Sequence, residues 1–406
     1  MKTLLYSAPG SAIIKSMFFR YERNEVKKTV TRIINARIYR TDDACFVPGT
    51  LAFAEGRIVD SARAADVTID AHGAYLAPGL VDVHTHGRAG TDFINADDAA
   101  LRRMALSYLE SGVTTLMPTL ASAPYVRMQE ATGRIAAAIG HTDGARFAGI
   151  HFEGRYLNPQ KRGAHAPDLL ASLCADELNG LADRMTGKGQ MHITAAFELD
   201  ADGSFAERAR ALGITLGIGH TMATYDQARL AEQRGVTAYT HLFNAMPPLH
   251  HREGGAVCAA LTGDAFCEMI CDGFHIAPEV VRLTYACKGE KLVLITDSME
   301  ATGCADGEYA IAGMPVTVTN GRAYTSDGAI AGSTLNLLDG VRNLAAFAGI
   351  PFEKALYCAT ASPAKEVGIY DMAGSLHVGK RADFLLLDRD YGLREVWLAG
   401  EKKSGK

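Results

Sequence analysis

Residues 78–87 read Pro-Gly-Leu-Val-Asp-Val-His-Thr-His-Gly, and this stretch sets the pattern from which the fold is predicted. Its apolar run, Leu80–Val83, predicts a short buried strand that ends at His84 and His86. Because side chains alternate along a strand, the two imidazoles should point the same way. Outward from this stretch, apolar runs alternate with helical segments, which is typical of parallel strands joined by helices.

Eight strand-like runs of this kind predict an α/β protein whose centre is a closed (β/α)₈ barrel of the TIM type. The runs are residues 80–83, 114–117, 148–151, 193–197, 215–218, 238–240, 269–271 and 292–296. In such barrels the active site lies at the carboxyl ends of the strands. Polar residues that follow these runs are therefore the first candidates for chemistry.

The two ends of the chain have a different pattern, with short strand-like runs separated by turn residues. These runs are residues 33–38, 51–53, 56–59, 382–388 and 395–398. We expect residues 29–76 and 365–406 to form one small β-sandwich domain, with the barrel, residues 77–364, inserted between its halves. Residues 1–28 lack a continuous apolar core and a cleavage site, so they are predicted to be a disordered leader rather than a signal peptide.

Composition narrows the class of protein. Of the 406 residues, 48% are hydrophobic and 21% are charged, which is typical of a soluble globular protein. The 41 Lys and Arg against 46 Asp and Glu leave a net charge of −5, which argues against a nucleic-acid partner. No apolar run is long enough to cross a membrane. The eight cysteines form no CxxC pair, so a reducing cytoplasm is the expected compartment.

Histidines and carboxylates follow several of the predicted strands. They are His84 and His86 after the first, Glu153 after the third, His220 after the fifth, His241 after the sixth and Asp297 after the eighth. Nitrogen and carboxylate ligands at one barrel mouth are what zinc or a similar divalent ion requires. Six such residues exceed the three protein ligands of a typical mononuclear catalytic zinc site, which favours two ions sharing a carboxylate. Asp297 suits proton transfer; alternatively, Asp297-Ser-Met-Glu300 is the capping box of a following helix.

Longer motifs surround these candidates. They are His151-Phe-Glu-Gly154, Gly163-Ala-His165, Gly219-His-Thr221, Thr240-His-Leu-Phe-Asn-Ala-Met246, His250-His-Arg-Glu253, Asp272-Gly-Phe-His275, Thr296-Asp-Ser-Met299 and Ala331-Gly-Ser333. From about residue 30 to the end, the chain resembles the N-acetylglucosamine-6-phosphate deacetylases of the amidohydrolase superfamily. The motif at 240–246 together with that at 250–253 is specific to this branch, whereas the motif at 78–86 marks only the superfamily.

The resemblance implies a role for each matching residue. The positions that match metal ligands are Glu153, His220 and His241 for a principal ion and His84 and His86 for a second ion bridged by Glu153. Zinc is the expected metal, with iron, manganese or cobalt as alternatives. Asp297 matches the general base, which then acts as acid towards the amine, and is also counted among the metal-site residues. His165 matches a histidine that polarises the acetyl carbonyl.

The resemblance also implies how the sugar phosphate is held. Asn244 and Ala245 match residues that meet the substrate, and Arg252 and His275 match phosphate ligands from the neighbouring subunit of a homodimer. Gly332 and Ser333 match a loop near the sugar; alternatively, they cap a helix before Leu335.

Two positions depart from the family, which usually has proline at both. They are Arg155 and Gly255, and both are expected beside the pocket, where Arg155 reads a hydroxyl of the sugar or faces solvent. His192 and Glu198 receive no role.

The expected reaction is hydrolysis of N-acetylglucosamine 6-phosphate to glucosamine 6-phosphate and acetate, in amino-sugar catabolism. One alternative changes only the sugar, to N-acetylgalactosamine 6-phosphate. Another is a different amidohydrolase activity, such as cyclic-amide opening, but the predicted fourth strand lacks the lysine that typically bridges the metals in that group. The last is a scaffold without activity, which would be expected to have lost some of the six candidate ligands.

Overall fold

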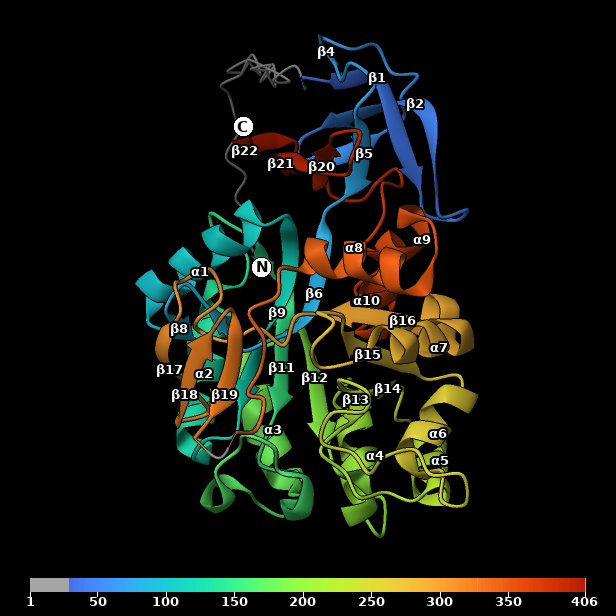
Figure 1. Ribbon diagram of the computed structural model, residues 1–406. Coiled ribbons are helices and arrows are strands. Elements are labelled where there is room, and N and C mark those ends of the chain that lie inside the picture. The colour runs from blue at the N-terminus through green and yellow to red at the C-terminus, as the bar shows by residue number, and fades with distance from the viewer. Residues whose placement is uncertain (1–28, 327, 406) are drawn as a thin grey trace, which may run out of the picture.

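Eight parallel strands form the centre of the molecule and bear out the predicted barrel (Figure 1). They are β6 (Leu80–Thr85), β9 (Val113–Ala121), β11 (Gly149–Glu153), β12 (Gln190–Ala195), β13 (Thr215–Ile218), β14 (Ala238–Tyr239), β15 (Phe266–Ile270) and β16 (Leu292–Ile295). The computed structural model describes residues 29–326 and 328–405, so the leader predicted for residues 1–28 lies outside the described residues. The strands pair in chain order, with β6 on the free side of β9.

The barrel is nearly closed, because the first and last strands meet through a few hydrogen bonds. The hydroxyl of Thr296 donates to a carboxylate oxygen of Asp82 over 2.7 Å. The backbone N–H of Asp297 donates to the carbonyl of His84 over 2.9 Å. Strands β6, β9, β11 and β16 are buried at every residue, as expected for parallel strands covered on both faces.

Ten α-helices accompany the strands within the described residues. They are α1 (Asp98–Glu110), α2 (Tyr125–Ala138), α3 (Ala175–Met185), α4 (Ser204–Ala211), α5 (Tyr225–Gln233), α6 (Gly255–Thr262), α7 (Pro278–Lys288), α8 (Leu337–Ala348), α9 (Phe352–Tyr357) and α10 (Ala361–Glu366). Local sequence explains several of their ends. Thr224 and Gln227 form a capping box at the start of α5, and Gly349, with φ of 66°, ends α8 in the left-handed conformation.

Strands from both ends of the chain form one mixed sheet at one end of the barrel (Figure 1). They are β1 (Thr31–Arg40), β2 (Cys45–Ala54), β3 (Arg57–Val59), β4 (Val67–Asp70), β5 (Tyr75–Pro78), β20 (Phe384–Leu387), β21 (Leu393–Leu398) and β22 (Glu401–Gly405). The ring of Phe53 lies 5.6 Å from that of Phe384 and 5.9 Å from that of Trp397, so strands from the two ends share one apolar core. The boundaries expected for the two domains stay a prediction.

An antiparallel sheet that the sequence did not predict follows the last barrel strand. It consists of β17 (Gly307–Ile311), β18 (Met314–Thr319) and β19 (Arg322–Thr325). Smaller additions are the paired β7 (Gly87–Arg88) and β8 (Thr91–Asp92), and β10 (Arg146–Phe147), which pairs with β9. No helix starts at Asp297, so the capping-box interpretation of that residue is wrong.

Among residues 29–326 and 328–405, no helix combines the length and apolar character needed to span a bilayer.

Candidate active site

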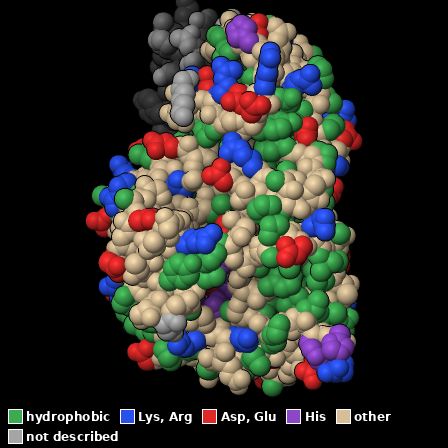
Figure 2. Space-filling view, viewed as in Figure 1, with side chains coloured by type: hydrophobic (Ala, Val, Ile, Leu, Met, Phe, Trp, Pro, Cys, Tyr) green, Lys and Arg blue, Asp and Glu red, His purple; other side chains and the backbone are tan. Residues whose placement is uncertain are grey.

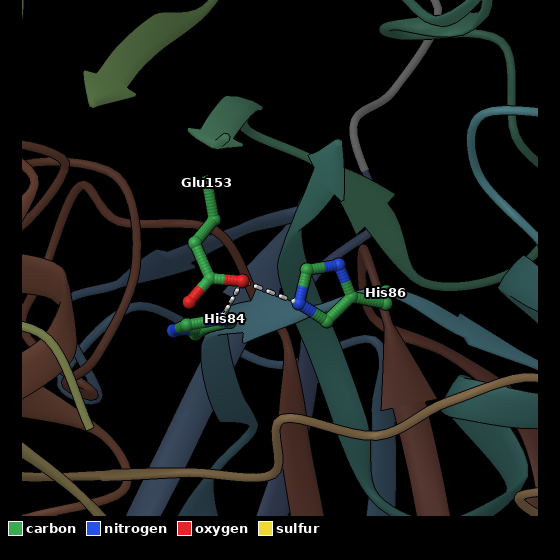
Figure 3. Close-up of side chains that lie close together, drawn as sticks. All are labelled: His84, His86 and Glu153. Atoms are coloured by element: carbon green, nitrogen blue, oxygen red, sulfur yellow. Dashed lines mark ion pairs between the residues drawn. The ribbon is translucent and has the colours of Figure 1, made fainter. Parts of the chain in front are cut away.

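The carboxylate of Glu153 lies at the centre of the barrel mouth, between two pairs of histidines. Its Oε2 is 2.9 Å from Nε2 of His86 and 3.5 Å from Nε2 of His84 (Figure 3). Its Oε1 is 2.7 Å from Nε2 of His241 and 3.1 Å from Nε2 of His220. Each carboxylate oxygen therefore faces its own pair of imidazoles.

Burial and charge set the protonation of these groups. Burial would raise the pKa of Glu153, but the surrounding histidines hold it well below its usual range. Burial would likewise raise the pKa of Asp297, but a hydrogen bond from His86 and the charge of His84 lower it. Burial lowers the pKa of His220 to about 4. Ionised carboxylates and a neutral imidazole are the states in which these residues bind a metal.

Neighbouring acceptors orient the imidazoles. Nδ1 of His84 donates to Oε2 of Glu268 over 2.9 Å, and Nδ1 of His220 donates to the carbonyl of Lys161 over 2.8 Å. Both rings therefore turn their Nε2 towards Glu153, and that of His84 is buried without a hydrogen-bond partner. Histidines that bind metals are commonly held by such acceptors. The residues present thus fit a divalent ion.

Asp297 lies at the edge of the same cluster. Its Oδ1 is 3.3 Å from Nε2 of His86 and 3.6 Å from Nε2 of His84. It follows β16 closely and lines the pocket above Glu153. An ionised carboxylate in this position can accept a proton from a molecule bound in the pocket.

His165 also points into the pocket, and its partners define which ring nitrogen carries the proton. The backbone N–H of Ser122 donates to Nδ1 of His165, so Nδ1 is an acceptor. The Ser122 hydroxyl, 2.9 Å from the same nitrogen, accepts from the backbone N–H of Arg155 and so donates its own proton to His165. The proton of a neutral His165 is therefore on Nε2, which lies 3.7 Å from Oε2 of Glu153.

The pocket brings together most of the residues predicted to bind substrate. Figure 2 shows a hollow in the molecular surface with a histidine side chain at its bottom. The hollow is lined by His86, Glu153, His165, His220, His241 and Asp297, and by Asn244, Ala245, His275 and Gly332. None of its described lining residues is a lysine or arginine.

Ser333 faces away from this pocket. Its hydroxyl donates to the carbonyl of Thr296 and accepts from the backbone N–H of Leu335. Helix α8 begins only at Leu337, so Ser333 caps no helix either.

Arg252 and His275 lie in different places in the structure. His275 lines the pocket of its own chain and is held by Asp272, whose carboxylate lies 2.7 Å from its Nδ1, so the prediction that it crosses from a neighbouring subunit is corrected. Arg252 is exposed and lines a separate hollow with Met222, Tyr225 and His250. Within one chain, Arg252 is therefore not part of the pocket.

The two departures from the family do not line the pocket, contrary to expectation. Nε and Nη2 of the Arg155 guanidinium each donate to the carboxylate of Glu177 over 3.1 Å, so Arg155 neither reads the sugar nor faces solvent. Gly255 begins α6 with φ of 60°, a conformation closed to proline, and lines the same hollow as Arg252. Glu198, which had no role, accepts from the backbone N–H of Met222 over 2.7 Å and so holds the loop after His220.

Three contributions to the site were not predicted. Glu268 orients His84, Ser122 orients His165, and Ile311 and Ala312 of the unpredicted sheet line the pocket. Glu268 is the one charged residue in the otherwise apolar run 266–270, and this position is a sequence signal that could have identified it. The other contributions have no local signal, because they depend on contacts between distant segments.

Comparison with known proteins defines the class. The sequence pattern of the amidohydrolase family matches residues 75–402, which span the barrel and the returning strands of the mixed sheet. The barrel and the histidine–carboxylate cluster at its mouth thus define a hydrolase of the amidohydrolase superfamily.

Individual relatives narrow this class. An N-acetylglucosamine-6-phosphate deacetylase of Vibrio furnissii is 33% identical, over 91% of this chain and 92% of its own length. An N-acetylgalactosamine-6-phosphate deacetylase of Escherichia coli is 32% identical, over 92% of this chain and all of its own length. A mutant N-acetyl-D-glucosamine-6-phosphate deacetylase of Mycobacterium smegmatis, solved with N-acetyl-D-glucosamine-6-phosphate, superimposes with a TM-score of 0.84 at 32% identity, covering 92% of this chain and 99% of the other. The chain belongs to the N-acetylglucosamine-6-phosphate deacetylase family.

Proposed function

We propose that this protein hydrolyses the acetamide of N-acetyl-D-glucosamine 6-phosphate to D-glucosamine 6-phosphate and acetate, in amino-sugar catabolism. The observation that supports this most strongly is the Glu153 carboxylate between two pairs of imidazoles, in a chain that belongs to this deacetylase family. N-acetylgalactosamine 6-phosphate is the second candidate substrate, because a deacetylase for that sugar is similar to almost the same extent, at 32% against 33% identity.

The cofactor in this proposal is a pair of divalent ions, with zinc as the first candidate and iron, manganese or cobalt as alternatives. Oε1 of Glu153 with His220 and His241 would hold one ion, and Oε2 with His84 and His86 would hold the other. When bound, such ions supply an activated water and polarise the amide carbonyl.

The protein's own groups then handle the proton and the developing charge. Asp297, ionised and at the pocket edge, takes the proton of the attacking water and returns it to the amine nitrogen as the C–N bond breaks. His165, with its proton on Nε2, donates a hydrogen bond to the acetyl oxygen as negative charge develops there. Asn244 and His275, which line the pocket, would contact the sugar phosphate.

The need for a basic side chain to bind the substrate phosphate favours a homodimer in this proposal. A phosphate dianion is normally met by Arg or Lys, and none lines the described pocket. Arg252 of a neighbouring subunit would supply that charge.

Eight cysteines, all of them free thiols, are in keeping with a cytoplasmic location.

The direct test is acetate release from four sugars: the 6-phosphates of N-acetylglucosamine and N-acetylgalactosamine, and the same two sugars without phosphate. We expect N-acetylglucosamine 6-phosphate to give the highest kcat/KM of the four sugars. EDTA should abolish its hydrolysis, and added zinc should restore it. A higher kcat/KM for N-acetylgalactosamine 6-phosphate would make that sugar phosphate the substrate instead. Release that is unaffected by EDTA, or none from any of the four, would contradict the proposal.

A further inference from the structure

Below the active site, the interior of the barrel holds a second group of polar side chains. His192 on β12, Glu268 on β15 and Glu366 at the end of α10 place a ring nitrogen and carboxylate oxygens within 4.8 Å of one another. Their exposed fractions are 0%, 0% and 3%. The interior of such a barrel is usually filled with branched apolar side chains, so two buried carboxylates beside an imidazole require a physical explanation.

The atoms that converge here have no hydrogen-bond partners among the described residues. They are Nε2 of His192, Oε1 of Glu268, and Oε1 and Oε2 of Glu366. Leaving a buried polar atom unpaired is costly, and more so when the group is charged. Unpaired buried polar atoms on three residues that lie this close together indicate that something occupies the space between them.

The tautomer of His192 shows what kind of group would fit. The hydroxyl of Thr215 donates to the carbonyl of Met191, so its oxygen accepts from Nδ1 of His192, 2.9 Å away. The His192 proton is therefore on Nδ1, and Nε2 presents a lone pair to the carboxylates. Burial lowers the pKa of this ring to about 4, which keeps it neutral. A nitrogen lone pair and carboxylate oxygens repel one another unless a positive centre lies between them.

Glu268 has one oxygen available for this space. Its Oε2 accepts from Nδ1 of His84 and from the backbone N–H of His241, over 2.9 and 3.2 Å. Its Oε1 is buried and has no hydrogen-bond partner among the described residues. One carboxylate thus connects the interior group to the histidines of the active site.

His151 lies between the two sites and forms a further group of potential ligands with His84 and Glu268, but both of its ring nitrogens already have hydrogen-bond partners. Its ring centroid is 4.5 Å from that of His84 and 4.6 Å from that of His192. Its Nδ1 donates to the carbonyl of Val83, and its Nε2 lies 2.8 Å from the hydroxyl of Thr194. Both ring nitrogens are therefore already used, which separates the interior group from the active-site pair.

We propose that His192, Glu268 and Glu366 bind a divalent transition-metal ion inside the barrel, distinct from the ions of the active site. Two carboxylates balance its charge, and an imidazole with two carboxylates is a donor set that zinc, manganese and iron accept. Donors about 2.0–2.2 Å from a shared ion lie roughly 3–4.4 Å from one another, which is compatible with the observed spacing. The ion would also hold Glu268 in the position from which it orients His84.

The competing occupant is a proton with a water molecule. Burial and the neighbouring Glu268 hold the pKa of Glu366 well above its usual range, which favours the protonated carboxyl when no cation is bound. A protonated Glu366 could then satisfy His192 through a water. The two occupants differ in electron count and in metal content, and both can be measured.

The test compares wild-type protein with Glu366→Gln, both purified from zinc-supplemented medium, dialysed against EDTA and then counted for zinc by mass spectrometry. The pocket ions are open to the chelator, whereas the interior ion is enclosed. We expect about one zinc per wild-type chain to survive dialysis, and none in Glu366→Gln. His86→Ala, which changes only the active site, serves as the matched control and should retain the resistant zinc.

A second measurement needs no variant. In crystals of undialysed wild-type protein, anomalous scattering at the zinc edge should give a peak between Nε2 of His192 and the carboxylate of Glu366. Absence of that peak overturns the proposal whatever the zinc counts, and leaves the water and protonated Glu366 as the occupant. Acetate release depends on the pocket, so this failure would leave the proposed function intact.

Discussion

Three of the six residues predicted to form the metal site have strained backbones. His220, His241 and Asp297 have φ angles of 47°, 30° and 47°, in the left-handed region that residues other than glycine rarely adopt. Each follows the end of a barrel strand, where the chain turns and directs the side chain towards Glu153. Such conformations cost on the order of 1–3 kcal/mol each. The backbone strain at these three residues therefore lowers the folding stability, and the apolar surface buried in the barrel compensates for this loss.

Asp297 provides the prediction at this scale. Asp297→Asn keeps the shape of the side chain and one oxygen but removes the group that takes the proton. We expect kcat to fall by about 10²–10⁴-fold while the metal content stays at the wild-type level. Steady-state kinetics and metal analysis of the same preparation check this. A variant whose kcat stays within about threefold of wild type would remove Asp297 from proton transfer.

At the scale of elements, the unpredicted sheet and the loop after it hold Asp297 in place. The backbone N–H of Ser333 donates to the carbonyl of Asp297 over 2.8 Å, and that of Met299 donates to the carbonyl of Ser333 over 3.0 Å. Gly332, with φ of 64°, lets this loop approach closely. A Cβ at Gly332 would lie 3.0 Å from the carbonyl oxygen of Asp297 and 3.0 Å from Cδ1 of Ile311.

Gly332→Ala should therefore displace Asp297. We expect kcat to fall by about tenfold or more, because small displacements of reacting groups are costly in rate. The free energy of unfolding should fall by about 1–3 kcal/mol from the backbone strain. Kinetics and denaturant titration measure the two effects.

Gly313→Ala is the matched control, since Gly313 also has positive φ, 76°, but a Cβ added there would have no other atom within 4 Å among the described residues. It should lose stability without losing kcat. Equal losses of kcat in the two variants would show that the close approach to Asp297 is unimportant.

At the scale of the whole molecule, no lysine or arginine is among the described residues that line the pocket, whereas Arg252 lies in a separate surface hollow. The hollow that contains Arg252 also contains Met222 and Tyr225, which expose 37% and 39% of their surfaces. Leu249, in the loop that leads to Arg252, exposes 47%. Aromatic, methionine and arginine side chains are enriched at protein interfaces, so this surface suits contact with a second subunit.

Mixed dimers test whether Arg252 acts across that contact. Arg252→Ala alone should lower kcat/KM for the phosphorylated sugar by about ten- to hundredfold, and the unphosphorylated sugar should be affected far less. When Arg252→Ala and Asp297→Asn chains are co-expressed with different tags and co-purified, one site of each mixed dimer has both residues intact. We therefore expect activity well above that of either parent. Activity no higher than the average of the two parent variants would show that Arg252 does not act across the subunit contact. It would then act in the active site of its own chain or have no part in the reaction.

Local sequence determined the barrel and the ring of candidate ligands. Parallel strands covered on both faces must be apolar throughout, so they could be recognised as runs, and 215–218 matches β13 to the residue. Because the carboxyl ends of parallel strands meet at one mouth, residues as far apart as His84 and Asp297 could be placed together without knowing any contact. The sequence of β18 alternates as a half-exposed strand should, but a run this short among turns does not by itself predict a strand.

Only the tertiary structure decided the roles that depend on a partner. Arg155 was expected beside the sugar, yet it pairs with Glu177, which α3 brings alongside it. His275 turned out to line its own pocket because Asp272 holds its ring, and Ser333 turned away because Thr296 accepts its proton. Glu268 and Glu366 come from segments about a hundred residues apart and meet only inside the closed barrel. Periodicity indicates which face of an element is buried, but the partner of a buried polar side chain is set by packing between distant segments.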